Sequence, residues 1–345
     1  MADPLVKMVL CPGGPDNARN SEASCIELRD GRLLLVWWHF YTGEGEDDSP
    51  GEVAARYSAD RGRSWSDTVV LQPNVARQTT GSPSLLRLKD GRIAFFYGTK
   101  NADDDLPFFV RFSSDESATW SEPVLVTTEP GYWVMNNDRA VQLSWGRIIA
   151  PVAWANDCYR PAQPWQSTVF YSDDGGHTWR RSRTWLRLEC ASGAQEPGVI
   201  ELKDGRVMMF CRTTERHPFI SFSEDGGETW SDLVAMENVW APCSPTCMKR
   251  IPSTGDLLMV WNNRAGSPPE LAQRRTPLTL AISRDEGQTW EHAKNLEDDP
   301  DADYAYTSIT FLDDEVLFTY YEYFPGRAPW LSLKLTIAPI SWLYS

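Results

Sequence analysis

Short apolar runs separated by polar turns recur along the whole chain and predict β-strands joined by tight hairpins. A turn of this kind, most often Asp-Gly, links one apolar run to the next six times. Asp-Gly between apolar runs is a strong hairpin signal, because Gly accepts the positive φ that such turns require. No long segment has the periodicity of an amphipathic helix. The expected class is therefore all-β, with turns that begin at Leu28, Leu88, Leu143, Leu202, Ser253 and Leu312.

A second phrase, Ser-x-Asp-x-Gly-x-x-Trp, follows five of these hairpins. Ser and Asp side chains can bond nearby backbone amides in a turn, Gly supplies positive φ, and Trp can fill the space between strands. The phrase is clearest in the copy at Ser172, and the copy at Ser113 is degenerate, with Ser117 in place of the glycine. The copies comprise Ser58, Asp60, Gly62, Trp65; Ser113, Asp115, Trp120; Ser172, Asp174, Gly176, Trp179; Ser223, Asp225, Gly227, Trp230; and Ser283, Asp285, Gly287, Trp290.

The spacing of these phrases predicts a repeat architecture. The five tryptophans lie about 50–60 residues apart, and a period of that length with about four short strands is typical of a propeller blade. Six hairpins predict a six-bladed β-propeller in one domain, residues 1–345. The sixth unit lacks the Trp phrase, so we expect a strand near Val6–Leu10 to pair with strands around Ser332–Ile337 and close the ring, which removes exposed edges.

Composition and charge narrow the function. The 345 residues carry a formal charge of −15, from 33 basic and 48 acidic side chains, which disfavours nucleic acid and anionic membranes as partners. An anionic substrate would need a local cluster of cations. No apolar run approaches the ~18 residues of a membrane span, and the N-terminus lacks the apolar core of a signal peptide. We therefore expect a cytoplasmic protein, unless a leader is missing. Its oligomeric state stays open.

The cysteines and histidines suggest neither a disulfide framework nor a metal site. The chain has seven cysteines, an odd number, and their spacing does not fit a metal site. We therefore expect buried free thiols. The four histidines do not cluster. We expect no metal and no cofactor.

The Ser-x-Asp-x-Gly-x-x-Trp phrase is the Asp box, and five copies at this spacing resemble the sialidase (neuraminidase) superfamily of six-bladed propellers. The resemblance covers the chain from about Arg19 to Tyr306. It implies an exo-α-sialidase, a retaining glycoside hydrolase in which three arginines bind the substrate carboxylate, a Tyr attacks, a Glu takes its proton and an Asp is the acid/base. A neutral phenol suits this role, since a carboxylate nucleophile would be repelled by the substrate carboxylate.

The resemblance assigns the arginines and the glutamate to particular positions. Arg19 takes the place of the first arginine, although the usual Arg-Ile-Pro is absent. Glu196 precedes an apolar strand and Arg212 ends the returning one, which is the family pattern. Arg275 precedes the last Asp box, with the adjacent Arg274 as its competitor; successive strand residues face opposite ways, so only one of them can point inward.

The remaining catalytic positions are taken from the same resemblance. Tyr306, next to Thr307, is the expected nucleophile, and Tyr304 is its competitor on the same strand face. Asp47 is the preferred acid/base in the acidic loop before the first Asp box, and Asp48 is the alternative. A run of acids is also typical of a solvated loop.

The segment Tyr132–Arg139 is rich in residue types that bind ligands. Asn136, Asn137 and Asp138 could bond sugar hydroxyls, and Trp133 and Met135 could line an apolar acyl pocket. The alternative for this segment is a structural turn with a surface pair between Asp138 and Arg139.

Three functions remain open at this point. The first is a sialidase acting on sialylated glycans. The second is a hydrolase of the same fold acting on another acidic sugar, either an ulosonic or a uronic acid, which the missing Arg-Ile-Pro keeps open. The third is a non-catalytic carbohydrate-binding propeller, which would not need Tyr306 and Glu196.

Overall fold

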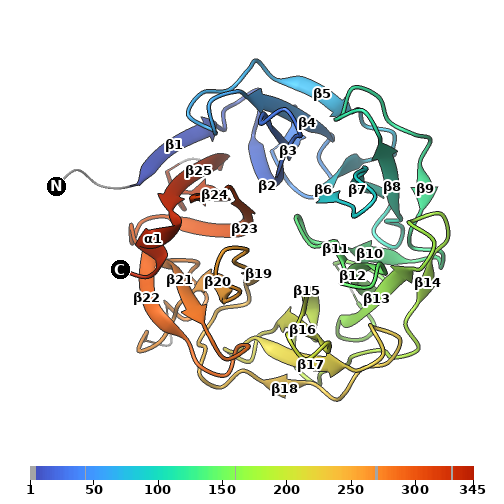
Figure 1. The fold of residues 1–345 in the computed structure, drawn as a ribbon, viewed down its shortest axis with the longest axis vertical. Helices are drawn as coiled ribbons and strands as arrows, with labels where there is room; N and C mark the ends of the chain where they lie inside the picture. The colour runs from blue at the N-terminus through green and yellow to red at the C-terminus, as the bar shows by residue number, and fades with distance from the viewer. Residues whose placement is uncertain (1–4, 43, 160, 269–270, 328) are drawn as a thin grey trace.

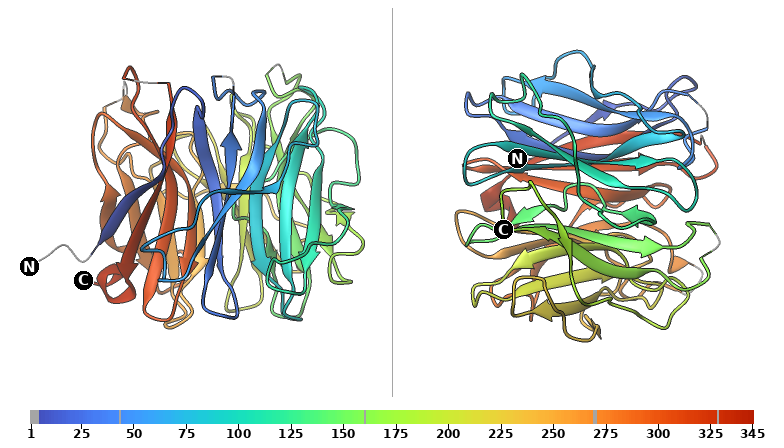
Figure 2. Two further views of the ribbon diagram at one scale, coloured as in Figure 1. Left: turned by 90° about the horizontal axis from the view of Figure 1, so that it is seen from above. Right: turned by 90° about the vertical axis from the view of Figure 1, so that its right-hand side faces the viewer.

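The structure, a computed structural model, describes residues 5–42, 44–159, 161–268, 271–327 and 329–345. In this part of the chain it contains 25 β-strands and one short helix, α1 (Ile340–Leu343), so the all-β prediction is confirmed. The sheets stand in a ring around a central axis (Figure 1). Seen from the side, the strands run between two faces that carry the connecting loops (Figure 2).

Four of the sheets are built from consecutive strands, with the first strand toward the centre of the ring and the last at its rim (Figure 1). Their strands are β6 (Thr79–Arg87), β7 (Ile93–Lys100), β8 (Phe108–Ser113) and β9 (Val124–Leu125); β10 (Tyr132–Val134), β11 (Val141–Gln142), β12 (Ile148–Ala155), β13 (Gln166–Ser172) and β14 (Arg180–Arg181); β15 (Gln195–Glu201), β16 (Val207–Arg212), β17 (Phe219–Ser223) and β18 (Val234–Ala235); β19 (Cys247–Arg250), β20 (Leu257–Asn262), β21 (Leu278–Ser283) and β22 (Glu291–Glu297).

The fifth sheet joins the two ends of the chain. It has eight strands, namely β2 (Arg19–Glu27), β3 (Leu33–Phe40), β4 (Gly51–Ser58) and β5 (Val69–Gln72) together with β23 (Asp303–Phe311), β24 (Glu315–Tyr323), β25 (Leu331–Pro339) and β1 (Val6–Cys11). Strand β1 runs antiparallel to β25, with Val6 opposite Ile337, so the predicted pairing of the termini is confirmed. One parallel pair, Arg19 with Leu331, links the two sets of strands. The six predicted hairpin units therefore form five sheets.

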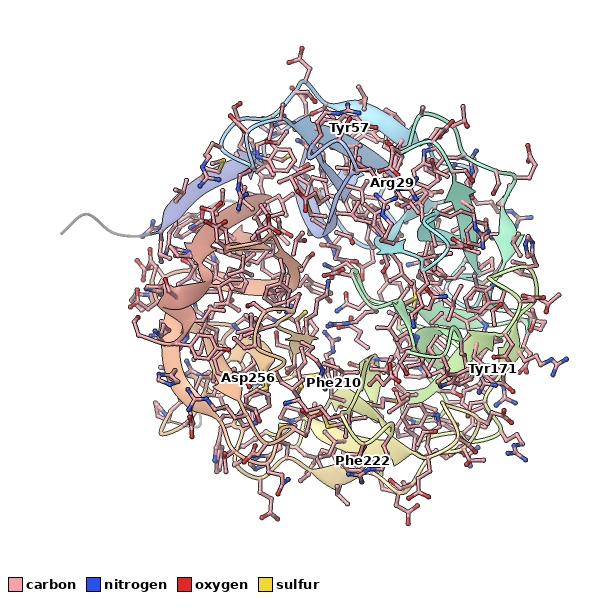
Figure 3. All side chains as sticks on the ribbon, in the orientation of Figure 1. Arg29, Tyr57, Tyr171, Phe210, Phe222 and Asp256 are labelled. Atoms are coloured by element: carbon pink, nitrogen blue, oxygen red, sulfur yellow. The ribbon has the colours of Figure 1, made fainter. Side chains whose placement is uncertain are left out.

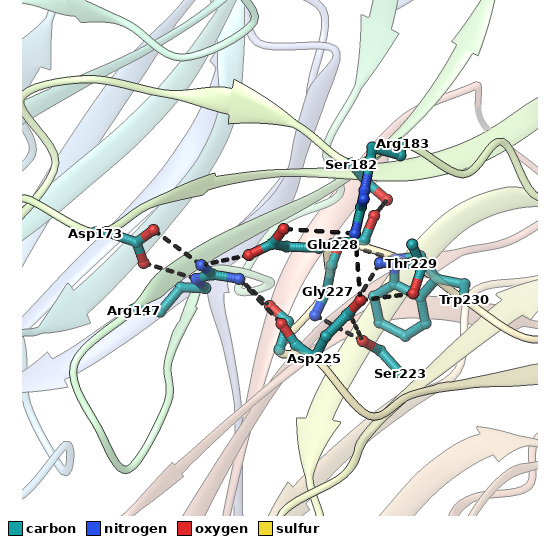
Figure 4. Close-up of polar contacts among 11 residues, drawn as sticks. Arg147, Asp173, Ser182, Arg183, Ser223, Asp225, Gly227, Glu228, Thr229 and Trp230 are labelled. Carbon is teal, nitrogen blue, oxygen red and sulfur yellow. Dashed lines mark hydrogen bonds and ion pairs between the residues drawn. The ribbon is translucent and has the colours of Figure 1, made fainter.

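The Asp boxes are compact turns that Figure 4 shows for the copy at Ser223. The Ser223 hydroxyl accepts the N–H of Gly227 at 2.7 Å and donates to Asp225 at 2.9 Å. Asp225 also accepts the N–H of Thr229 at 2.8 Å, and the Trp230 indole donates to the Gly227 carbonyl at 3.2 Å. Gly227 has φ 96°, which explains the glycine of the phrase.

Neighbouring Asp boxes are tied together across the sheets. Arg147 donates to Asp173 at 2.7 and 2.8 Å and to Glu228 at 3.1 Å, and its guanidinium also reaches the carbonyl oxygens of Asp225 and Gly226 (Figure 4). Arg147 is buried, so it joins the hairpin of one sheet to the box of the next.

The core lies between neighbouring sheets, where side chains fill the space around the ring (Figure 3). One cluster packs Phe96 of β7 against Phe170 of β13 and Trp179, and another packs Phe210 of β16 against Trp261 of β20. All seven cysteines are unpaired. The expectation of buried thiols holds for Cys11, Cys25, Cys211 and Cys247, whereas Cys158, Cys190 and Cys243 are partly exposed.

Residues 136–139 interrupt the inner strand of their sheet and reach the centre of the ring. Strands β10 and β11 both pair with β12, and the segment between them contacts four other inner strands. Asn137 donates to the carbonyls of Ala23 and Tyr306 at 2.6 and 3.1 Å. Asp138 accepts the Ser308 hydroxyl at 2.8 Å, the Ile309 N–H at 3.1 Å and the Ser24 hydroxyl at 3.3 Å, and pairs with Lys249 at 2.6 Å. Arg139 donates to the Thr246 carbonyl at 2.7 Å.

Loss of a buried Asp-box tryptophan should destabilise the fold. Trp179 and Trp230 are 5% and 8% exposed. Trp179→Ala and Trp230→Ala should each lower the free energy of unfolding by about 3–5 kcal/mol, because a large aromatic is removed from a packed site. Chemical denaturation measures the change. Trp145, which is 57% exposed, is the control, and Trp145→Ala should unfold like wild type. Unchanged midpoints for both buried variants would contradict this account.

Loss of the Asp138 carboxylate should loosen the centre of the ring. Asp138→Ala removes the acceptor of two hydroxyl groups and of the Ile309 N–H, and it removes the ion-pair partner of Lys249, so unfolding should become easier by about 2–4 kcal/mol. Asp314→Asn is the control, because this carboxylate is 80% exposed and exposed pairs contribute little. Equal denaturation midpoints for the two variants would show that Asp138 does not hold the strands together.

Candidate active site

A cavity of about 210 Å³ lies where inner strands of several sheets meet. Charged and amide side chains form part of its wall, and aromatic and aliphatic side chains form the rest. No residue of the Asp-box phrases lines it. The lining residues are Arg19, Glu22, Trp38, Asp47, Ser82, Leu106, Phe108, Tyr132, Val134, Asn136, Ala153, Cys158, Tyr159, Trp165, Gln195, Glu196, Arg212 and Tyr306.

Backbone bulges in four inner strands direct polar side chains into this cavity. Glu22, Ser82, Glu196 and Tyr306 have φ values of 55°, 51°, 42° and 58°, and each lies where its strand slips register against its neighbour. A bulge turns a side chain away from the alternation of the strand. The left-handed conformation costs energy for these residue types and persists only where the surroundings enforce it.

Tyr306, Glu196 and Arg212 form one hydrogen-bonded group drawn from two sheets. The Tyr306 hydroxyl donates to Glu196 Oε1 at 3.1 Å, and Arg212 Nη1 contacts Glu196 Oε2 at 2.9 Å and the Tyr306 oxygen at 3.5 Å. Arg212 Nε also donates to Gln195 at 3.0 Å. Burial, followed by the charge of Glu196, raises the pKa of Tyr306 above its usual value. The phenol therefore keeps its proton beside a carboxylate that can accept it.

Arg19 is shared between two carboxylates on the other side of the cavity. Its guanidinium donates to Glu22 Oε1 at 2.7 Å and to Asp47 Oδ1 at 2.6 Å, and its Nε donates to Ser21 at 2.9 Å. Ser82 donates to Glu22 Oε2 at 2.8 Å. The rings of Trp38 and Phe40 lie 5.4 and 4.9 Å from the guanidinium.

The two carboxylates on Arg19 differ in protonation. Burial raises the pKa of Glu22 to about 7, and the charges of Asp47 and Glu196 add to this against the opposing effects of Arg19 and Ser82. Burial also acts to raise the pKa of Asp47, but the charge and hydrogen bond of Arg19 outweigh it and hold this pKa below its usual value. At neutral pH Asp47 is ionised, whereas Glu22 is close to half protonated.

The two arginines expected from the sequence point in different directions, although they lie before β21 and belong to no strand. Arg274 turns away from the cavity and donates to Asp303 at 2.9 Å. Arg275 lies beside Tyr306, with its guanidinium carbon 5.7 Å from the ring centroid, and donates to Tyr321 at 2.9 Å and to the Cys243 carbonyl at 3.3 Å. It does not line the cavity as described. Arg19 and Arg212 therefore face the cavity, and Arg275 is close to its wall.

Several other predicted positions lie outside the cavity. Asp48 is exposed and is not among the lining residues. Tyr304 is 1% exposed and packs against Tyr320 in the core. Asn137 and Asp138 bond strands at the centre of the ring instead of lining the cavity. The segment turns there, but Asp138 and Arg139 are buried and Asp138 pairs with Lys249, so the expected surface pair is wrong.

In the segment before Asn137, the residues expected to line an acyl pocket do not face the cavity. Trp133 and Met135 are buried in the hydrophobic core, while Tyr132, Val134 and Asn136 line the cavity. Side chains of a strand alternate between its two faces. If the wrong face is assigned to the cavity, the residues expected in the core and those expected in the cavity change places. Asn136 is 2% exposed, and its Nδ2 is buried without a partner.

Glu22, Ser82 and Gln195 are polar lining residues that the sequence analysis did not select. Glu22 follows Arg19 by three residues, and simple alternation would place the two side chains on opposite faces. The bulge brings them to the same side. The one available signal was an acidic residue inside a strand of small and apolar residues, Ser21 to Ile26.

Metal-binding clusters and membrane-spanning helices were sought in the part of the chain that the structure describes. No three His, Cys, Asp or Glu side chains there are grouped to hold a metal ion. None of the helices described is long and apolar enough to cross a membrane.

The sequence of this chain is similar to a known domain family and to known sialidases. The BNR repeat-like domain family matches residues 31–318. A sialidase from Micromonospora viridifaciens is 26% identical over 331 residues, which cover 86% of this chain and 48% of that protein. The chain thus spans about half the length of this relative.

Solved structures share the fold at lower identity. A protein of unknown function from Dyadobacter fermentans has a TM-score of 0.78 at 20% identity, covering 97% of this chain and 99% of that one. Trypanosoma rangeli sialidase in complex with the inhibitor DANA has a TM-score of 0.76 at 17% identity, covering 98% and 60%. From the family match across most of its length and the sialidase relatives, this chain belongs to the BNR repeat-like domain family within the bacterial sialidase superfamily.

Proposed function

We propose that this protein is a six-bladed β-propeller and a retaining exo-α-sialidase that removes terminal sialic acid from glycans. The observation that carries the proposal is the hydrogen bond from Tyr306 to Glu196, which joins residues 110 positions apart at 3.1 Å inside a cavity. The eight-stranded sheet counts as two blades, because one parallel pair joins its two four-stranded sets.

Tyr306 acts as the nucleophile and Glu196 as its base. Glu196 takes the phenolic proton while the Tyr306 oxygen attacks the anomeric carbon, and the bond from that carbon to the aglycone oxygen breaks as an acid protonates the leaving oxygen. Water then attacks the same carbon, gives a proton to that acid/base, and expels Tyr306, which regains its proton from Glu196. A phenol needs such a base because its own pKa lies far above neutral pH.

Arg19 and Arg212 bind the substrate carboxylate, and Arg275 adds positive charge beside Tyr306. Guanidinium groups suit this task because their planar fork can bond both oxygens of a carboxylate. Asn136 Nδ2, buried without a partner, is available to a polar group of the sugar. The aromatic wall, including Tyr132, Tyr159 and Trp165, packs against its apolar parts.

Asp47 is the proposed acid/base, and its pairing with Arg19 sets when it can act. In the free cavity Arg19 keeps Asp47 ionised, which is the wrong form for an acid. A substrate carboxylate on Arg19 would take over that cation and add a negative charge, and both effects raise the pKa of Asp47. Substrate binding thereby prepares Asp47 to protonate the leaving oxygen.

A second candidate is hydrolysis of another acidic sugar, an ulosonic or uronic acid. It is favoured by the position of Arg275, which bonds Tyr321 and the Cys243 carbonyl and does not line the cavity. With only Arg19 and Arg212 facing the cavity, the substrate carboxylate could lie at a different position from the one that three arginines would require. Hydrolysis of fluorogenic α-sialosides beside uronides and other ulosonides decides between the two sugars.

Removing the Tyr306 hydroxyl should abolish turnover without abolishing binding. Tyr306→Phe should lower kcat by about 10³-fold or more while the dissociation constant for a carboxylate inhibitor changes little, because only the reacting oxygen is lost. Glu196→Gln should behave similarly. Tyr304→Phe on the same strand is the matched control and should keep wild-type kcat. Wild-type activity in Tyr306→Phe would make Tyr306 a packing residue only.

The stereochemistry of the product tests the same step independently. With Tyr306 as nucleophile, an α-sialoside should release the α-anomer first, because two displacements retain configuration. Proton NMR during the first minutes, before mutarotation, follows the anomers. Initial release of the β-anomer would indicate a single displacement by water.

The carboxylate contact should depend on the guanidinium fork of Arg212. Arg212→Lys keeps the charge but loses the paired donors, so a planar carboxylate inhibitor should bind about 10-fold or more weakly. Arg274→Lys is the matched control, since Arg274 turns away from the cavity, and should bind as wild type does. Calorimetry gives both constants. Equal affinities in the two variants would place the carboxylate away from Arg212.

A further inference from the structure

The cavity contains more carboxylates than cations. Its charged lining residues are two arginines and three acids. Arg212 pairs with Glu196, and Arg19 is shared by Glu22 and Asp47. One carboxylate is therefore in excess when all three are ionised, before any substrate enters.

An acidic sugar would add another negative charge to this group. The two lining arginines would then face four carboxylates in a partly desolvated space, where like charges repel strongly, and the third nearby cation, Arg275, lies outside the lining, beside Tyr306. Protonating one acid is the least costly way to relieve the repulsion. The structure indicates which acid that is.

Glu22 is the acid best placed to take the proton. Its side chain is 5% exposed, against 11% for Glu196 and 55% for Asp47. Glu196 has Arg212 as its own cation, and Asp47 is the more solvated partner of Arg19. Glu22 also has Ser82 beside it, and a serine hydroxyl can turn from donor to acceptor when a carboxylic acid forms.

We propose that Glu22 binds the substrate carboxylate as a neutral carboxylic acid, so that uptake of an acidic sugar is coupled to uptake of one proton. The inference rests on the proposed function, because it requires an anionic ligand on Arg19. When that carboxylate displaces Glu22 from the guanidinium, the protonated Glu22 donates its O–H to the incoming oxygen. Glu22 is then a ligand-binding residue in addition to the arginines.

The protonation of the free cavity agrees with this role. The pKa of Glu22 is raised to about 7, so an added anion would raise it further and draw a proton from solvent at neutral pH. The groups that face Glu22 are Arg19 of its own strand, Asp47 from the loop after β3, Ser82 of β6, Glu196 of β15 and Tyr306 of β23. None of the residues placed along the cavity is a histidine.

The test is calorimetric binding of 2,3-dehydrosialic acid, a planar carboxylate analogue, to the full chain between pH 5.5 and 9. At pH 7 wild type should take up about half a proton more per ligand than Glu22→Gln, measured in two buffers of different ionisation enthalpy, because a proton gained by Asp47 is common to both proteins. Above pH 7.5 its affinity should fall about 10-fold per pH unit, because Glu22 must first gain a proton.

Two variants assign the proton to Glu22. Glu22→Gln is permanently neutral, so the part of the pH dependence that Glu22 contributes should be lost, and its affinity should exceed that of wild type at pH 9; any proton gained by Asp47 is common to both proteins. Glu27→Gln, an exposed position on the same strand, is the matched control and should keep the wild-type profile. Ser82→Ala removes a hydrogen bond that stabilises ionised Glu22, so its affinity should begin to fall at a higher pH than in wild type.

The outcomes separate this inference from the proposed function. Binding that is independent of pH in wild type, or a wild-type slope in Glu22→Gln, overturns the role of Glu22 and leaves the sialidase proposal intact. No binding of the analogue at any pH overturns the proposed function and this inference with it. Proton uptake in wild type and in Glu27→Gln, together with the upward shift in Ser82→Ala, supports the role even if Glu22→Gln does not fold.

Discussion

The geometry of the site depends on the carboxylate of Asp138 and the amide of Asn137 at the centre of the ring. Four bulged residues, Glu22, Ser82, Glu196 and Tyr306, hold left-handed backbone conformations that an isolated strand would not adopt. Asn137 bonds the carbonyls beside two of these bulges, and Asp138 collects donors from β2, β19 and β23. The segment between β10 and β11 thus bonds the strands that carry Glu22 and Tyr306.

The sequence predicts the local parts of this fold well, because hairpins and Asp boxes are determined by residues a few positions apart. The Asp-Gly turns and the Ser223 to Trp230 bonds need only their own segments. The catalytic pair was reached by another route, since Glu196 and Tyr306 were placed by family resemblance and no local signal joins them. The backbone bulges in the inner strands could not be predicted from the sequence. A regular alternation would separate Arg19 from Glu22, and the bulge in β2 breaks it. For Trp133 the alternation holds, and the expected face of the strand was the wrong one.

The distribution of charge bears on the proposal that this acidic protein accepts an acidic ligand. The chain carries a net charge of −15, yet two guanidiniums face the cavity, and each is already neutralised by a carboxylate in the free state. An incoming anion therefore competes with internal anions for the same cations. Such a cavity favours ligands whose geometry matches both arginines, because a simple anion gains little by replacing a carboxylate that is already in place.

The same competition links binding to catalysis. Arg19 keeps Asp47 ionised and shares its charge with Glu22, so whatever occupies Arg19 changes the protonation of two acids at once. Tyr306 is independent of this exchange, because its partner Glu196 is held by Arg212 on the other side of the cavity. In the proposed mechanism, the nucleophile Tyr306 is thus prepared before substrate arrives, whereas the proton donor Asp47 is prepared only by a substrate that carries a carboxylate. A neutral sugar could reach Tyr306 but would leave Asp47 without its proton, and this gives the site a basis for selecting acidic sugars that does not depend on affinity alone.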